Sequence, residues 1–287
     1  MKSLYDISAP AKLNLFLHIT GRRSDGYHLL QSVFMLIDWC DTLHFDVRAD
    51  GHISREDLGT SLPVEDLIVR AARALQAASN SRFGVHIGIE KRIPAQAGMG
   101  GGSSDAASTL LALNRLWKLD YSLEKLTHIG LQLGADVPFF LGGRNAWVEG
   151  IGDKMTPITL PQSRFLVVKP IDGLETSLIF SDPALKRDSK TAIISGFAAD
   201  KLGFGRNDLQ SVAQRLCPSV TQALEWLELH GLSGRMTGSG SAVFAQMLQH
   251  IDLKDAPSAF QIRVCNSLDV HPLLGWASSD GLSVDSF

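Results

Sequence analysis

The chain has 287 residues, of which 45% are hydrophobic and 20% are charged, and its formal net charge is −3. Such a chain can bury one large core or two modest ones, and its charge gives no reason to expect nucleic acid or an anionic membrane as a partner. Its three cysteines, Cys40, Cys217 and Cys265, lack the spacing of a zinc site or a disulfide framework. Because we find neither a signal peptide nor a run that spans a membrane, we expect a soluble cytoplasmic protein.

The first predicted element is a strand over residues 7–19, where apolar and polar residues alternate. One face carries five aliphatic side chains, namely Ala11, Leu13, Leu15, Leu17 and Ile19. The opposite face carries Lys12, Asn14, Phe16 and His18. On this pattern alone, Lys12 is interpreted as a solvated lysine on an exposed strand face, because lysines are rarely buried.

A turn over residues 21–28 leads into predicted strands at 28–37 and 42–49. Tyr27 and His28 stand at the entrance to the first of these strands. They are either simply an aromatic and a polar residue at a strand end or groups that contact a ligand, and the pattern leaves both interpretations open. After a loop, an amphipathic helix is predicted from Asp66 to residue 75.

Residues 93–107 form a glycine-rich segment between a predicted strand at 83–93 and a helix that continues to Trp117. Its glycines allow backbone N–H groups to approach a ligand with no Cβ in the way. The helix N-terminus adds unpaired N–H groups and the positive end of its dipole, so the segment predicts a phosphate site. It is neither a P-loop, which needs a lysine after Gly102, nor a dinucleotide fingerprint, whose third glycine would replace Ser103.

Asp136 follows a predicted helix over residues 122–133, which is bounded by Gly134. Since Val137 and Pro138 come next, this aspartate is either the N-cap of another helix or a functional carboxylate. A further strand is predicted at 145–149. The prolines that follow it indicate a domain boundary, which gives domains at residues 1–157 and 158–287.

The second half of the chain predicts strands at 164–169 and 261–264 and an amphipathic helix at 220–229. The charged residues at 186–190 are interpreted as a solvated loop. A second glycine-rich cluster, at residues 234–244, lies between two strand-like pieces and taken alone predicts a tight hairpin.

Four of these segments resemble the signatures of the GHMP kinases, the family of galactokinases, homoserine kinases, mevalonate kinases and phosphomevalonate kinases. Residues 94–104 (PAQAGMGGGSS) are similar to its phosphate-binding signature, and residues 11–14 (AKLN) to its N-terminal motif. Residues 134–140 (GADVPFF) are similar to the segment with the catalytic aspartate, and the cluster at 234–244 to the third motif, which lines the substrate end of the site. The segments follow the family's order over nearly the whole chain.

The resemblance extends to one branch of the family. The three glycines before Ser-Ser-Asp-Ala-Ala, together with the Gly-Tyr-His of residues 26–28, resemble the branch that acts on a cytidine diphosphate-linked methylerythritol in the non-mevalonate isoprenoid pathway. This implies an ATP-dependent kinase that phosphorylates the 2-hydroxyl of that small molecule. In this branch Asp136 would accept the hydroxyl proton, with Lys12 as its charge partner, and Tyr27 and Phe180 would stack on the two sides of cytosine.

The family's ligand contacts map onto two sets of residues in this sequence. ATP contacts would come from Asp66, Lys91, Pro94, Ala95, Gln96, Ala97, Gly98, Met99, Gly100, Gly101, Gly102, Ser103 and Ser104. Substrate contacts would come from Asn14, Tyr27, His28, Thr176, Phe180 and Gly238. Without the resemblance, Lys91 is a solvated strand lysine and Phe180 a core phenylalanine.

Three positions depart from the family's usual residues. Asp66 stands where an asparagine usually contacts adenine, and an ionised carboxylate is only an acceptor. Gln96 and Met99 stand where glycine and leucine are commoner. Mg²⁺ is expected to accompany ATP, but no carboxylate cluster in the sequence marks a protein ligand for it.

Strands and helices alternate without regular βαβ repetition, which predicts an α+β fold, and the resemblance implies two domains with the active site in the cleft between them. Two alternatives stay open. One is a GHMP kinase for another small alcohol, such as homoserine, a sugar or mevalonate. The other is a non-catalytic, nucleotide-dependent sensor on the same scaffold. The oligomeric state is not predicted.

Overall fold

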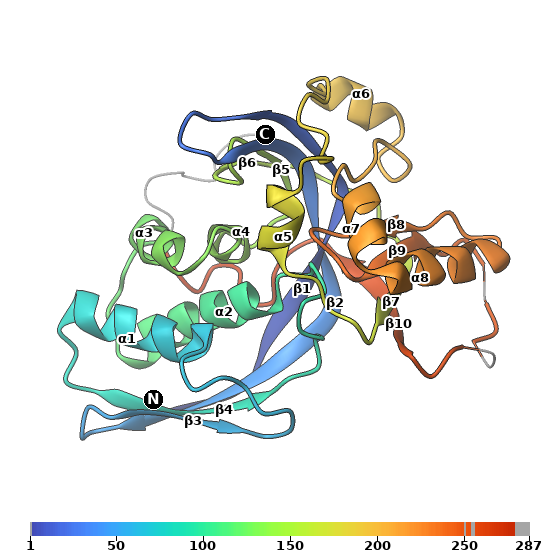
Figure 1. Ribbon diagram of the computed structural model, residues 1–287. Helices are drawn as coiled ribbons and strands as arrows, with labels where there is room; N and C mark the ends of the chain where they lie inside the picture. The colour runs from blue at the N-terminus through green and yellow to red at the C-terminus, as the bar shows by residue number, and fades with distance from the viewer. Residues whose placement is uncertain (1, 250, 254–255, 279–287) are drawn as a thin grey trace.

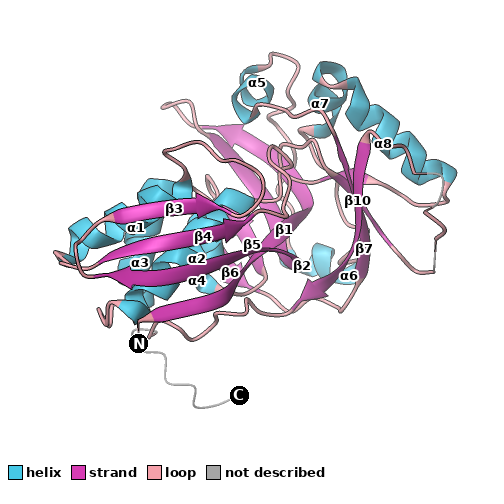
Figure 2. Ribbon diagram, turned by 90° about the horizontal axis from the view of Figure 1, so that it is seen from below, coloured by secondary structure: helices cyan, strands magenta, loops and turns pink. Residues whose placement is uncertain are grey.

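The computed structural model describes residues 2–249, 251–253 and 256–278, and these fold around one mixed sheet (Figures 1 and 2). The strands of the sheet are β1 (Ser3–Arg22), β2 (His28–Arg48), β3 (Ile53–Asp57), β4 (Gly84–Glu90), β5 (Ala146–Glu149), β6 (Lys154–Pro157), β7 (Arg164–Pro170), β8 (Arg235–Met236), β9 (Val243–Gln246) and β10 (Phe260–Leu268). The helices are α1 (Leu67–Ser79), α2 (Gly101–Leu116), α3 (Leu123–Leu133), α4 (Val137–Gly142), α5 (Thr176–Ser181), α6 (Ile194–Ala199), α7 (Gln210–Leu216) and α8 (Pro218–Leu229). The predicted α+β class is confirmed.

Two long antiparallel strands, β1 and β2, run through the molecule and join its two ends (Figures 1 and 2). The prediction of two separate strands at 28–37 and 42–49 is wrong, because β2 continues through residues 38–41, which contain neither glycine nor proline. The strand is not interrupted. Instead, the pairing of β2 with β1 shifts its register between Pro10 and Ala11 of β1. A bulge thus absorbs the proline without ending the pair.

The first half of the chain places four helices, α1 to α4, together on one face of the layer that contains β1, β2, β4 and β3 (Figures 1 and 2). Strand β3 pairs in parallel with β4, which pairs antiparallel with β2. Their apolar faces form one buried cluster, in which Phe45 and Ile87 of the sheet pack with Leu110 and Leu113 of α2. This core fixes the helix that follows the glycine-rich segment.

The second half extends the sheet in the order β10, β7, β9 and β8, and β10 pairs with β2 at Ser267 and Leu268. Helices α7 and α8 pack beside these strands in a second buried cluster, which includes Val220, Trp226 and Val243. The predicted strands at 164–169 and 261–264 and the helix at 220–229 are confirmed as β7, β10 and α8. Residues 176–181, to which the pattern assigned no element, form helix α5.

A third buried cluster lies between the two ends and takes residues from both halves, including Leu13, Trp147, Phe165 and Phe244. The boundary between residues 157 and 158 therefore stays a prediction. The cysteines at positions 40, 217 and 265 are all free, as their spacing indicated. No helix in the described ranges combines the length and the apolar character needed to cross a bilayer.

Candidate active site

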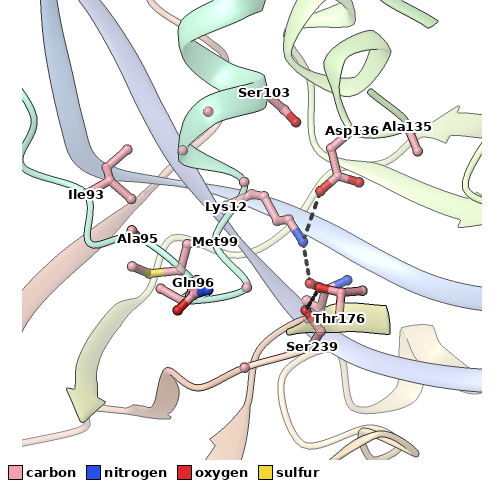
Figure 3. Close-up of a pocket in the computed structure, with 18 of the residues that line it drawn as sticks. Lys12, Ile93, Ala95, Gln96, Met99, Ser103, Ala135, Asp136, Thr176 and Ser239 are labelled. Atoms are coloured by element: carbon pink, nitrogen blue, oxygen red, sulfur yellow. Dashed lines mark hydrogen bonds and ion pairs between the residues drawn. The ribbon is translucent and has the colours of Figure 1, made fainter. Parts of the chain in front are cut away.

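A cavity of about 870 Å³ opens between the glycine-rich segment, the middle of β1, the Asp136 turn and helix α5 (Figure 3). Most of the predicted site residues line it. From the two predicted sets and the catalytic pair these are Lys12, Asn14, Asp66, Lys91, Pro94, Ala95, Gln96, Ala97, Gly98, Met99, Gly100, Gly101, Gly102, Ser103, Asp136, Thr176, Phe180 and Gly238. Ser104, Tyr27 and His28 are not among its lining residues.

Lys12 is buried at the centre of the cavity wall, with 4% of its surface exposed, so the expectation of a solvated lysine is wrong. Its Nζ donates to Asn14 Oδ1 at 2.6 Å and lies 3.6 Å from Asp136 Oδ2 (Figure 3). The ring of Phe34 lies beside the ammonium, with its centroid 4.6 Å from Nζ. Burial lowers the pKa of Lys12, and the nearby Asp136 carboxylate only partly opposes this effect.

Asp136 occupies the N-cap position of α4, and Pro138 stands in the first turn of that helix. The carboxylate makes no capping hydrogen bond, so the N-cap interpretation does not account for its side chain. Instead the side chain faces Lys12 and is 32% exposed (Figure 3). A carboxylate that faces a cavity with an ammonium beside it is suited to accept a proton from a bound hydroxyl.

Asn14 holds the base of the cavity in place through both its side chain and its backbone. Its Nδ2 donates to Ser32 Oγ at 2.9 Å, while its Oδ1 accepts from Lys12. Its backbone N–H donates to Thr237 Oγ1 at 2.9 Å. Asn14 thus connects β1 to β2 and to the second glycine-rich cluster.

The glycine-rich segment ends at the N-terminus of α2, where Gly100 is the N-cap with φ +71°. No side chain caps this helix, so its first N–H groups stay available to a ligand in the cavity. The segment is fixed to β1 by a hydrogen bond from Lys12 N to Met99 O at 3.0 Å. Gln96 takes φ +50°, a left-handed conformation that glycine adopts more easily.

The two glycine-rich segments pack backbone against backbone. A Cβ added to Gly98 would lie 2.2 Å from the carbonyl oxygen of Thr237, and one added to Gly238 would lie 2.6 Å from that of Gly98. Asn207, buried in the segment 207–209, donates from Nδ2 to the carbonyl oxygens of Met236 and Gly238, both at 2.8 Å. The second cluster is therefore a fixed wall of the cavity as well as the hairpin that its pattern predicted.

Lys91 is a second cation at the cavity, with 12% of its side chain exposed, and its interpretation as a solvated strand lysine is wrong. Its Nζ contacts the carboxylates of Asp41 and Asp105, the latter at 2.7 Å. Asp41 also accepts from the backbone N–H groups of Arg92 at 2.6 Å and Ile93 at 2.8 Å. The triad of Asp41, Lys91 and Asp105 thus joins the strand before the glycine-rich segment to the helix after it.

Asp66 lies at the edge of the cavity as the N-cap of α1, where its Oδ1 accepts from Val69 N at 3.0 Å. The same oxygen lies 2.9 Å from Nη1 of Arg55, whose side chain is 8% exposed. Both contacts are made by Oδ1, so this oxygen of the carboxylate is engaged within the protein.

The predicted substrate end of the site is partly assembled. Thr176 Oγ1 and Ser239 Oγ lie 2.7 Å apart at the cavity (Figure 3), and Phe180 lines it from the end of α5. The ring of His28 packs against that of Phe180 with centroids 5.1 Å apart, but Tyr27 is 62% exposed. Ser104 is buried in α2, away from the cavity lining.

Sequence reasoning missed several residues that line or support the cavity: Ser239 lines it, while Thr237 and Asp41 bond to segments that do. The first two lie within the second glycine-rich cluster, so their segment was found but their hydroxyls were not. Asp41 gave no signal, because it lies between two predicted strands and contacts residues far along the chain.

Comparisons with known proteins indicate the family to which the chain is similar. A family model described as "GHMP kinases N terminal domain" matches residues 66–144, and one described as "GHMP kinases C terminal" matches residues 194–261. A relative from Albidiferax ferrireducens named 4-diphosphocytidyl-2-C-methyl-D-erythritol kinase is 82% identical over 286 residues, which cover 100% of both chains. A relative of the same name from Variovorax paradoxus is 64% identical over 296 residues, 97% of this chain and 100% of the relative.

Solved structures give the same picture of the fold. A crystal structure of 4-(cytidine 5'-diphospho)-2C-methyl-D-erythritol kinase superposes with a TM-score of 0.78 at 31% identity and covers 92% of this chain and 98% of its own. A homoserine kinase from Cytophaga hutchinsonii superposes with a TM-score of 0.69 at 13% identity, covering 94% and 96% of the two chains. The second similarity shows only the shared fold.

Proposed function

This chain belongs to the GHMP kinase family and is an ATP-dependent phosphotransferase, and from that premise we propose that it phosphorylates the 2-hydroxyl of 4-diphosphocytidyl-2-C-methyl-D-erythritol. The choice of acceptor rests on the relatives with that name. The observation that carries the chemistry is the meeting of Lys12, Asp136 and the uncapped N-terminus of α2 at one cavity.

In this proposal Asp136 accepts the proton of the attacking 2-hydroxyl. The hydroxyl oxygen bonds to the γ-phosphorus of ATP as the bond from that phosphorus to the β,γ-bridging oxygen breaks, and ADP leaves. Lys12, 3.6 Å from Asp136, favours the ionised carboxylate before the transfer and offsets charge on the moving phosphoryl group. Its hydrogen bond to Asn14 holds the ammonium in position for both roles.

The glycine-rich segment is proposed to bind the ATP phosphates. Phosphates fit a helix N-terminus whose N–H groups have no partner, and no side chain competes for those of α2. Phe180 is proposed to contact the cytosine ring together with Tyr27 and His28, so that binding far from the reacting atoms fixes the hydroxyl. Because Tyr27 is exposed and lies outside the cavity lining, its contact requires the substrate to extend beyond the cavity.

Mg²⁺ is proposed to arrive with ATP and to neutralise phosphate charge. The described part of the chain holds no group of three or more His, Cys, Asp or Glu side chains suited to a metal. Two carboxylates at the cavity, Asp66 and Asp105, are already paired with Arg55 and Lys91. Mg²⁺ in kinases is usually held by substrate phosphates, waters and one or two carboxylates, and we assign it no particular protein ligand here.

The test measures ATP turnover by the purified protein with four acceptors: 4-diphosphocytidyl-2-C-methyl-D-erythritol, homoserine, mevalonate and galactose. We expect turnover only with the first. Asp136→Asn should lower kcat by about 10²–10⁴-fold with little change in ATP binding, because a general base contributes that much. Asp50→Asn, which changes an exposed aspartate paired with Arg48, is the matched control and should keep wild-type turnover.

Each other outcome has a definite meaning. Turnover of a different alcohol would retain the scaffold and reject the acceptor. Binding of ATP with no turnover of any acceptor would favour the nucleotide-dependent sensor. An Asp136→Asn variant with wild-type kcat would remove Asp136 from the role of base.

A further inference from the structure

Arg187 is a half-buried arginine whose hydrogen bonds connect the ring of His28 to the backbone of Phe180, at the substrate end of the cavity. Its Nε donates to His28 Nε2 at 3.0 Å. Its Nη2 donates to the carbonyl oxygens of Phe180 at 3.1 Å and Asp182 at 2.8 Å, and its Nη1 to that of Leu185 at 3.0 Å. The interpretation of residues 186–190 as a solvated loop is therefore wrong for Arg187.

The contact with Arg187 determines where His28 carries its proton. A guanidinium has only donors, so the Nε2 atom that receives its hydrogen bond must be an acceptor. A neutral imidazole with an acceptor at Nε2 carries its proton on Nδ1. Burial, and then the positive charges of Arg187 and Arg22, lower the pKa of His28, which agrees with a neutral ring.

The Nδ1–H group of this tautomer is left for a ligand. No described residue forms a hydrogen bond with His28 Nδ1. His28 does not itself line the cavity, but its ring lies against that of Phe180, which does, so the ring adjoins the proposed base site.

We propose that Arg187 is a positioning residue that fixes His28 as the Nδ1–H tautomer and thereby makes the base site select cytosine over uracil. This inference rests on the proposed function, since it assumes that the substrate carries a pyrimidine. Cytosine presents an acceptor at N3, which an Nδ1–H group can bond. Uracil presents a donor at N3, which would face the same N–H and leave both groups unpaired.

Arg187 also fixes the other ring of the site. The carbonyls of Phe180 and Asp182 end helix α5, and a cation that bonds the last carbonyls of a helix stabilises that end. Phe180 and His28 are thus held relative to one another by a single guanidinium. Lysine, with one point charge, cannot form this set of bonds.

The first experiment reads the tautomer directly and needs no substrate. In ¹⁵N-labelled protein at pH 7.5, the wild-type His28 ring should show a protonated Nδ1 and an unprotonated Nε2 by long-range ¹H–¹⁵N NMR. In Arg187→Leu the ring should shift toward the Nε2–H form. A wild-type His28 that is protonated at Nε2, or at both nitrogens, would overturn the proposal even if the variant does not fold.

The second experiment measures base selection with matched cytidine and uridine diphosphate-linked methylerythritols. Arg187→Leu should raise KM for the cytidine substrate, keep the KM for ATP, and lower the ratio of kcat/KM for cytidine over uridine by about tenfold or more. Lys186→Gln is the control, because the neighbouring Lys186 contacts the exposed Asp188 and not His28. It should keep the wild-type ratio. Arg187→Lys should not restore the ratio.

A merely structural role for Arg187 predicts a different result. Local unfolding of residues 180–187 would lower kcat/KM for both substrates equally and leave their ratio unchanged, and that outcome would overturn the proposal. Failure of the wild-type protein to phosphorylate either substrate would contradict the proposed function and, with it, the selection of a base. The NMR experiment would then still decide the tautomer.

Discussion

The ammonium of Lys12 lies in a buried position, where desolvation disfavours its charged form. With only 4% of the residue exposed, desolvation lowers the pKa of the ammonium despite the carboxylate of Asp136 nearby. For a base with a lowered folded-state pKa, the folded state becomes more stable as pH rises through the interval between the folded and unfolded values. Below that interval the ammonium is charged in both states, and the cost of burying it is fully present. A side chain that costs stability at a cavity is typical of a functional residue.

We therefore expect Lys12→Met to separate activity from stability. The variant should lower kcat by about 10²-fold or more, because the charge next to the transferred phosphoryl group is lost. Its free energy of unfolding in urea should be unchanged or higher, by on the order of 1 kcal/mol, since the desolvation cost is removed. Lys190→Met, at an exposed position, is the control and should keep wild-type activity. A strongly destabilised Lys12→Met protein would show that the lysine is structural.

Asp105 gives a prediction about pH. Burial, together with repulsion from Asp41, raises the pKa of Asp105 to about 8, although Lys91 acts in the opposite direction. An acid whose folded pKa is raised binds a proton in the folded state that the unfolded state has already released. Its contribution to stability is therefore complete below about pH 4 and declines as pH rises toward 8.

Asp105→Asn should remove this decline, because the amide stays neutral and its oxygen still accepts from Lys91. We expect the variant to gain stability relative to wild type between pH 5 and pH 8, by on the order of 1 kcal/mol or more. Urea unfolding at the two pH values measures the difference. Asp50→Asn should follow the wild-type profile in this range. An equal decline in the wild type and Asp105→Asn would mean that Asp105 is ionised throughout.

At the scale of elements, glycines of the glycine-rich segment serve two different purposes, packing within the protein and access of a ligand to the backbone. Substitutions at Gly98 and Gly102 can separate these two purposes. Gly98 has φ +71° and leaves no room for a Cβ beside the carbonyl of Thr237. Gly102, in the first turn of α2, has ordinary helical geometry, and a Cβ there would meet only Leu67 Cδ1, at 3.4 Å. The first glycine is required by the protein's own packing, whereas the second is required only if a ligand approaches the backbone.

Gly98→Ala should lower the free energy of unfolding by about 2 kcal/mol or more, through overlap and backbone strain. Gly102→Ala should keep or slightly raise stability, because alanine favours a helix by about 0.5–1 kcal/mol over glycine. It should nevertheless raise the KM for ATP roughly tenfold, since a Cβ would displace the phosphates. Chemical unfolding and steady-state kinetics on both variants provide the test. An unchanged KM in Gly102→Ala would place the phosphates elsewhere.

The elements themselves were largely predictable, because apolar periodicity depends on neighbouring residues. The strand at 7–19, the helix at 122–133 and the helix that follows the glycine-rich segment all appear near their predicted bounds. The burial of Lys12 and the ion pairs of Lys91 were not predictable from the local sequence pattern. Both lysines are covered by elements distant in sequence, and their partners Asp136, Asp41 and Asp105 belong to other segments.

Arg187 illustrates the same limit at the substrate end. The run of charges at residues 186–190 has the composition of a solvated loop, and composition carries no information about which carbonyls lie within reach. The acceptors of Arg187 are the end of helix α5, which the sequence pattern did not predict, and His28 on β2. Its role emerges only when those two elements meet in space.

At the scale of the whole molecule, the cavity is assembled from both halves of the chain. Lys12, Asn14 and the glycine-rich segment come from the first half, and Thr237 and Gly238, which contact Asn14 and Gly98, come from the second. The third buried cluster crosses the same border, since Leu13 and Trp147 pack with residues of β7 and β9. Neither half can bury these apolar surfaces alone, so the contact between the two halves forms part of the hydrophobic core.

We therefore expect the chain to unfold in one cooperative transition. In urea, the loss of kinase activity, of tryptophan fluorescence and of far-ultraviolet circular dichroism should share one midpoint, because site and core depend on the same contacts. A fragment of residues 1–157 should fail to unfold cooperatively, as it would expose the face that packs on Phe165 and Phe244. The full chain under identical conditions is the control. Two separate transitions, or a cooperatively folded fragment, would show that the predicted domains are independent units and that the third cluster contributes little to holding the cavity together.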